Sequence, residues 1–188
     1  MGVLEHDERA GARVVALIAG IPREGWSAST PCSEWTVRDL VAHLIAGNVK
    51  YTGIARGDDF VPGAPDVVVG DDPAATYRET LSEMLQAWQV PGALDREIGL
   101  PRGARGRAEV AAWIHLAETL GHGWDLAIAT NQEPGFEDED AAASLAECRG
   151  RIPAQRGAGS RFADAVNGVD GPLIDQLAAY LGRARQRT

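Results

Sequence analysis

A long apolar segment between residues 107 and 130 is the feature that most restricts how this chain can fold. From residue 110 to 129 nearly every side chain is apolar or small, and the ionisable exceptions are His115, Glu118, His122 and Asp125. At 3.6 residues per turn these exceptions fall within an arc of about 80°, so they form one polar stripe on a helix that is otherwise apolar. Such a helix must be covered on most sides by other helices, which predicts an all-α fold.

Five further helices are predicted from apolar residues that recur at helical spacing. The first ends at Pro22, which cannot continue a helix. The second begins at Thr36, which forms an acidic variant of the capping box with Asp39, and it runs to about residue 56. The others are expected from about Tyr77 to before residue 91, at 137–148 and at 172–182, with a short hairpin around residues 101–103.

This pattern predicts a single domain over residues 1–188. The bundle core is expected at about residues 4–130, with long crossover loops, and a C-terminal extension is expected at about residues 131–188. A chain of this length buries roughly 70% of its unfolded surface, so it needs no disulfide or structural metal to hold it together. Any metal ion that it binds is therefore expected to be functional.

The charge balance excludes two classes of partner. The chain has 18 basic and 27 acidic side chains, a formal net charge of -9, so neither nucleic acid nor an acidic membrane surface is an expected partner. The longest apolar run, residues 14–21, is shorter than the about 18 residues that span a membrane. The first ten residues lack a secretory signal, so we expect a cytoplasmic protein in which Cys32 and Cys148 are free thiols.

Two residues of the polar stripe have the spacing of a metal site. Glu118 and His122 stand at i and i+4, so one ion can contact both, as it contacts the two histidines of an HExxH motif. A second histidine would complete a His2Glu set, which is a catalytic zinc shell with one open position. His43 is the natural candidate, because His6 is near the terminus and His115 lies about 10.5 Å along the helix from His122.

The same residues also fit a purely structural role. A buried charge without a partner costs several kcal/mol, so the stripe can be a hydrogen-bonded core network in which Glu118 and Asp125 pair with histidines and arginines. Spacing alone gives this network and the metal site equal weight. A di-iron carboxylate oxidase is disfavoured, because such bundles need two Glu-x-x-His motifs and the sequence has none.

Two sequence blocks resemble a known family. Residues 26–48 read WSASTPCSEWTVRDLVAHLIAGN, and residues 118–130 read ETLGHGWDLAIAT. Both are similar to the metal-binding domain of the mycothiol-dependent maleylpyruvate isomerase family, within the DinB-like superfamily. The tail over residues 166–183, VNGVDGPLIDQLAAYLGR, resembles the closing segment of uncharacterised actinobacterial members. The resemblance implies a DinB-like four-helix bundle with additional C-terminal helices.

The resemblance also implies a cofactor and a class of reaction. In that family a divalent ion, typically zinc, is bound by residues that correspond to His43, Glu118 and His122. Relatives include the isomerase and S-transferases that use mycothiol or bacillithiol, so a metal-dependent thiol S-transferase or isomerase acting on an electrophilic substrate is implied. The alternative is a non-catalytic metal or thiol sensor, or a stress-binding protein, with the same site. Nickel or another divalent ion would also suit these ligands, and the relatives suggest a homodimer.

Four residues near these blocks carry further expectations. Asp125, on the same stripe, is expected to orient a ligating histidine or to position an arginine such as Arg38, rather than to bind the ion directly. His115 is expected either to shape the pocket from outside the ligand set or to be a hydrogen-bonded core residue. Cys32 is expected to be a small buried residue at a helix entry rather than a nucleophile, and Trp35 is expected to pack in the bundle.

Overall fold

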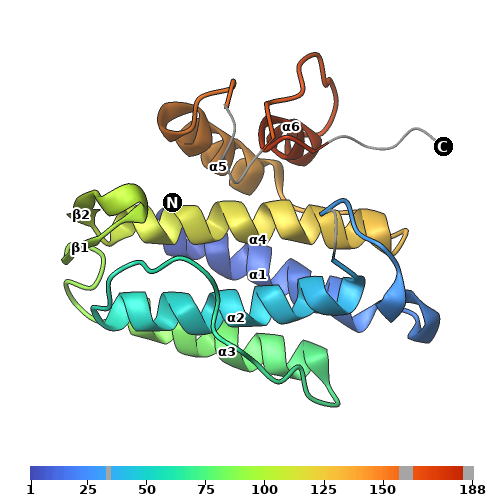
Figure 1. The fold of residues 1–188 in the computed structure, drawn as a ribbon, viewed down its shortest axis with the longest axis horizontal. Helices are drawn as coiled ribbons and strands as arrows, with labels where there is room; N and C mark the ends of the chain where they lie inside the picture. Colours follow the sequence, from blue (N-terminus) through green and yellow to red (C-terminus); the bar gives the residue numbers. More distant parts are fainter. Residues whose placement is uncertain (33–34, 157–162, 184–188) are drawn as a thin grey trace.

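The computed structural model describes residues 1–188 except 33–34, 157–162 and 184–188, and it shows an all-α molecule with one small antiparallel sheet (Figure 1). The elements are α1 (Val3–Ala19), η1 (Arg23–Ser27), α2 (Val37–Arg56), α3 (Pro73–Trp88), β1 (Glu97–Gly99), η2 (Pro101–Gly103), β2 (Arg105–Arg107), α4 (Glu109–Ala129), α5 (Asp138–Arg151) and α6 (Leu173–Tyr180). The predicted fold class is thus confirmed, and strands β1 and β2 form the predicted hairpin.

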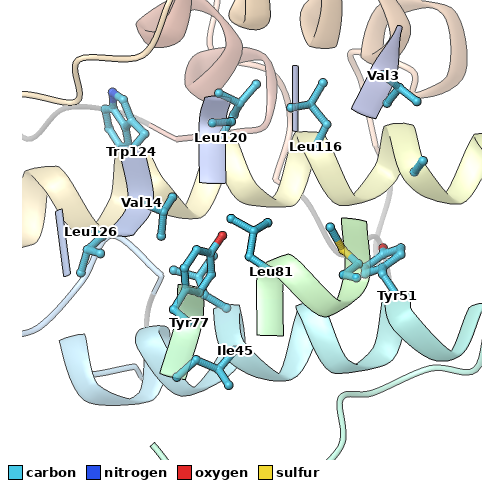
Figure 2. Close-up of a cluster of buried hydrophobic side chains, with 14 of the residues drawn as sticks. Val3, Val14, Ile45, Tyr51, Tyr77, Leu81, Leu116, Leu120, Trp124 and Leu126 are labelled. Carbon is cyan, nitrogen blue, oxygen red and sulfur yellow. The ribbon is translucent and has the colours of Figure 1, made fainter. Parts of the chain in front are cut away.

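Helix α4 lies at the centre of the molecule. It packs against α1 and α2, which in turn pack against α3, and these four helices form the bundle. On its other side α4 is covered by α5 and α6, as Figure 1 shows. Its side chains Leu116, Leu120 and Trp124 are buried in the core shown in Figure 2. Being covered on both sides explains why the α4 sequence is apolar around most of its circumference.

The start of α2 is held by the predicted capping box. The Thr36 hydroxyl oxygen accepts a hydrogen bond from the Asp39 amide at 3.2 Å, and the Asp39 carboxylate accepts one from the Thr36 amide at 2.9 Å. Just before the cap, the Thr30 amide donates to the Trp35 carbonyl at 3.1 Å. The Trp35 amide in turn donates to the Cys32 carbonyl at 3.1 Å, so Cys32 and Trp35 lie together near the N-terminal end of α2.

Helix α3 begins four residues earlier than the apolar periodicity predicts. Asp72 caps it by accepting a hydrogen bond from the Ala75 amide at 3.0 Å, and Pro73 occupies the first turn, where a missing N–H costs nothing. The periodicity begins only at Tyr77 because the first turn of α3, Pro73 to Thr76, has no large apolar side chain. A prediction based on buried spacing therefore misses this turn.

Buried polar contacts join the C-terminal helices to the bundle. The Asp140 carboxylate of α5 accepts a hydrogen bond from His6 at 2.6 Å and also contacts Arg9, both on α1. The Trp124 indole of α4 donates to the Asp175 carboxylate of α6 at 2.7 Å. Among the helices of the described residues, none combines the length and the apolar character that crossing a bilayer requires.

Candidate metal centre

Helices α2 and α4 bring the three predicted ligands to one small cavity. His43 on α2 and Glu118 and His122 on α4 all line it, and its volume is about 10 Å³, room for a single water-sized particle. The imidazole rings of His43 and His122 lie 4.9 Å apart between centroids and are nearly perpendicular, at 81°. Two helices that are far apart in the sequence therefore present two imidazoles and a carboxylate to one space.

His43 and Glu118, which line this cavity together with His122, are suited to bind a cation. Among the described residues, none forms a hydrogen bond with the half-buried Glu118 carboxylate. Burial, together with the nearby charges of His122 and Lys50, lowers the pKa of His43 to about 4. At neutral pH His43 is therefore uncharged and has a free lone pair, while Glu118 supplies negative charge. This donor chemistry fits a divalent ion such as zinc.

A buried carboxylate holds His122 from outside the cavity. The Nδ1 atom of His122 lies 3.1 Å from the Asp125 carboxylate, which is 0% exposed. Burial alone would raise the pKa of Asp125, but the hydrogen bond from His122 and the charge of Arg183 outweigh it and lower that pKa. Asp125 is therefore a carboxylate that accepts the Nδ1 proton of His122, which leaves Nε2 as the nitrogen with a free lone pair.

A second cluster lies on the far side of the His122 ring. The Cys32 thiol donates to the Asp125 carboxylate at 3.1 Å and lies 3.7 Å from His122 Nδ1. Cys32, His122 and Asp125 are the one trio in the described part of the chain whose possible ligand atoms all lie within 4.8 Å of one another. The Arg183 guanidinium already supplies the positive charge there, with Nη2 2.8 Å from Asp125. The predicted trio of His43, Glu118 and His122 is more widely spaced.

Cys32 is half-buried rather than buried, and its place against Asp125 makes it a poor nucleophile. Removal from water, reinforced by the negative charge of Asp125, raises the pKa of its thiol to about 12. Because the thiolate is the reactive form, the thiol is inert near neutral pH.

His115 and Trp35 lie beside the cavity in different ways. His115 lines it, yet its Nδ1 is 2.7 Å from Asp7 and its Nε2 is 3.1 Å from Asn48, so neither nitrogen is available to an ion. Trp35 is half-buried, and its ring centroid lies 4.6 Å from that of His43 and 5.9 Å from that of His122. It therefore covers the two imidazoles at the outer edge of the bundle.

The arginine that accompanies Asp125 is Arg183, whereas Arg38 instead lies over the Trp26 ring, 5.4 Å from its centroid. No local pattern distinguished Arg183 from the other arginines. The sequence signal that could have pointed to Arg183 is the tail block over residues 166–183, which ends on this residue.

Comparison with known proteins places this chain in a family. The sequence model of the mycothiol maleylpyruvate isomerase N-terminal domain matches residues 8–127, which is more than half of the chain. The chain belongs to this family. The matched region includes His43, Glu118, His122 and Asp125, and it ends before α5 and α6.

Two relatives match this chain over nearly its whole length. Two uncharacterised proteins of Mycobacterium tuberculosis, from two strains, are each 33% identical over 185 residues, which is 97% of this chain and 98% of theirs. Crystal structures of a mycothiol-dependent maleylpyruvate isomerase and of a variant with one histidine replaced by alanine match with a TM-score of 0.57 each. They are 13% and 12% identical and cover 76% of this chain and 68% of the isomerase chain, which shows a shared fold.

Proposed function

We propose that this protein binds one divalent metal ion, zinc in the first instance, through His43, Glu118 and His122, and uses it to activate a low-molecular-weight thiol of the mycothiol type. The thiol would then attack an electrophilic substrate in an S-transfer or isomerisation reaction. The solved isomerase with the same fold is described as mycothiol-dependent, which supports a thiol of this class.

One observation carries the proposal. Two imidazoles from different helices and a carboxylate without a hydrogen-bond partner among the described residues line the same cavity, which has room for one small particle. A purely structural network would pair the carboxylate with a donor, as His115 is paired with Asp7. The His2Glu set also leaves one coordination position for a thiol.

When bound, the ion would supply Lewis acidity that lowers the pKa of a thiol ligated to it. The chain's residues prepare the site for that ion. His43 offers a neutral imidazole near pH 7, and Glu118 adds the negative charge that partly balances a dication. Asp125 holds the His122 ring with Nδ1 protonated, so that Nε2 has the free lone pair.

The reacting thiol has to come from outside the chain. Cys32 lies beside the site, but its thiol is turned to the Asp125 carboxylate and its pKa is about 12. Cys148 is buried on α5 and burial raises the pKa of its thiol too. A small thiol can approach through the side of Gly47, where an added Cβ would meet nothing within 4 Å.

Titration of the metal-free protein with zinc, in competition with a chromophoric chelator, tests the metal site. We expect one tight site per chain, lost in His43→Ala and His122→Ala and weakened in Glu118→Gln. His6→Asn is the matched control, because it removes an imidazole from the α1–α5 contact without touching the cavity. A site of unchanged affinity in the two alanine variants would refute the ligand assignment.

Turnover separates an enzyme from a sensor that has the same ligands. The zinc-loaded protein is mixed with mycothiol and a chloronitrobenzene electrophile, and the thioether product is followed by absorbance. A transferase gives a rate that saturates with mycothiol and disappears in His122→Ala. Tight zinc and thiol binding with no rate above background would instead favour the non-catalytic alternative.

A further inference from the structure

The last described residue of the chain is inserted into the group of side chains that holds His122. The Arg183 Nε atom donates to both oxygens of Asp125 at 2.9 Å, and Nη2 donates to one of them at 2.8 Å. The Arg183 side chain is 11% exposed and that of Asp125 is 0% exposed. This is a forked, charge-assisted contact in a nearly dry environment, the strongest type of side-chain hydrogen bond.

The fold is built to bring Arg183 to this position. Gly182 has a φ of +86°, a left-handed conformation that turns the chain at the end of α6. The Arg183 amide then donates to the Ala178 carbonyl at 2.9 Å, which closes the turn. On α4, a Cβ added to Gly121 would lie 3.1 Å from Leu181 and 3.6 Å from the Arg183 guanidinium. Both glycines therefore allow the C-terminal segment to approach α4 closely.

The contact acts on His122 through Asp125. A carboxylate oxygen accepts the proton of the imidazole nitrogen that it faces, so the position of Asp125 decides which nitrogen of His122 carries the proton. The Asp125 oxygen lies 3.1 Å from Nδ1, closer than Nη2 of Arg183 at 3.4 Å, which leaves Nε2 to the ion. Arg183 fixes the two oxygens of Asp125 by its hydrogen bonds, so the Nδ1 proton of His122 has an acceptor in a fixed position.

We propose that Arg183 is a positioning residue of the metal centre: it orients Asp125, which in turn keeps His122 in the tautomer that binds the ion. The inference rests on the proposed function, because it assigns a role toward the same ion. It also makes the C-terminal segment part of a site whose ligands all lie within residues 8–127, the region matched by the family.

The direction in which zinc affinity changes when Arg183 is replaced separates this positioning role from a direct electrostatic effect on the ion. A guanidinium close to a metal site repels the metal ion, so if Arg183 acted only through its charge, removing it would strengthen zinc binding. If it acts through Asp125, removing it weakens zinc binding. Loss of an outer partner of a ligating histidine typically costs 10–100-fold in metal affinity.

The first test compares zinc affinities by chelator competition. We expect Arg183→Gln to bind zinc about tenfold or more weakly than wild type, and Arg183→Lys to lie between them because lysine keeps the charge and loses the fork. Arg151→Gln is the matched control: it removes the same charge from an exposed pair on α5 and should leave the affinity unchanged. In an Asp125→Asn background, Arg183→Gln should add no further loss. Equal or tighter binding by Arg183→Gln, or the same loss in both backgrounds, would overturn the proposal.

The second test needs neither metal nor a variant. Nitrogen-15 NMR of the imidazoles in the metal-free wild-type protein should show His122 protonated at Nδ1, with Nε2 unprotonated. A His122 protonated at Nε2 would overturn the proposal even if Arg183→Gln fails to fold. If wild type binds no zinc at all, the proposed function fails, whereas the NMR result still tests the contact of Asp125 with His122 Nδ1 on which the role of Arg183 depends.

Discussion

Gly47 illustrates how a single residue can matter by what it lacks. It lies inside α2, where glycine costs about 1 kcal/mol relative to alanine. Its backbone φ is not positive, and an added Cβ would meet nothing within 4 Å, so neither the backbone nor the packing requires glycine here. Gly47 lines the cavity one turn after His43. The position fits a requirement for open space beside the site.

Substitution of Gly47 separates the access of the small thiol to the cavity from the binding of zinc. Gly47→Ala should raise the free energy of unfolding by up to about 1 kcal/mol and leave zinc affinity unchanged. Gly47→Leu should also keep zinc but raise the Kd for the small thiol at least tenfold, measured by calorimetry on the zinc-loaded protein. Thiol binding by Gly47→Leu at wild-type affinity would show that the thiol approaches from another side.

Cys32 provides a second prediction at the residue scale, on reactivity. A thiol with a pKa of about 12 has very little thiolate near neutral pH, so iodoacetamide should alkylate it two to three orders of magnitude more slowly than in the urea-unfolded chain. Peptide mass spectrometry after timed quenching gives the rate for Cys32 separately from that of Cys148. Comparable rates in folded and unfolded protein would contradict the burial of Cys32 against Asp125.

Between elements, one group of buried polar side chains around His115 joins all four helices of the bundle near the cavity. His115 of α4 contacts Asp7 of α1 at 2.7 Å and Asn48 of α2 at 3.1 Å, and Asn48 donates through its amide nitrogen to the Tyr77 carbonyl on α3. Because the amide nitrogen of Asn48 is used in this way, its oxygen faces His115 Nε2. Both ring nitrogens of His115 therefore face acceptors, which favours the doubly protonated form.

The pair of His115 and Asp7 predicts a pH dependence of stability. Burial alone would lower the pKa of His115, but the charge and hydrogen bond of Asp7 outweigh it and raise that pKa above 6.5. The stability due to the extra bound proton is complete below pH 6.5 and is lost as the pH rises through the folded pKa. In urea unfolding of the metal-free protein, the advantage of wild type over His115→Gln should shrink as the pH rises above 6.5. Parallel stability curves for the two proteins would contradict this linkage.

The elements also show how far the sequence alone could predict the molecule. The α2 start, the α4 span and the β1–β2 hairpin follow local signals, namely the Thr36–Asp39 box, an apolar run and a Pro-Gly turn, and all three predictions are confirmed. Convergence of His43 with Glu118 and His122 on one cavity agrees with the predicted set, although their role as ligands stays a prediction. Arg183 lies 58 residues from Asp125 along the chain, and nothing local marks the pair.

Across the whole molecule, the C-terminal helices depend on a few buried contacts with the bundle. Asp140 is 1% exposed and is the α5 residue that accepts from His6 and Arg9 of α1. Asp140→Asn leaves these donors without a charged acceptor and should lower the free energy of unfolding by about 1–3 kcal/mol. Urea unfolding measures this change in the free energy of unfolding. Amide hydrogen exchange should be faster in α5 of Asp140→Asn than in α5 of the wild type.

The neighbouring acid serves as the control for this change. Glu139 contacts the same Arg9, but its side chain is 62% exposed, so Glu139→Gln should be nearly neutral, within about 0.5 kcal/mol. If the two substitutions have equal effects, the buried Asp140 contact does not hold α5 to the bundle.

X-ray absorption of the zinc-loaded protein, prepared without any added thiol, tests the central claim most directly, because two trios of residues compete for the ion. Coordination by His43, Glu118 and His122 predicts imidazole nitrogen and carboxylate oxygen at about 2.0–2.2 Å and no sulfur. Coordination by Cys32, His122 and Asp125 would instead add a zinc–sulfur distance of about 2.3 Å. Observation of that sulfur, abolished by Cys32→Ser, would contradict the account.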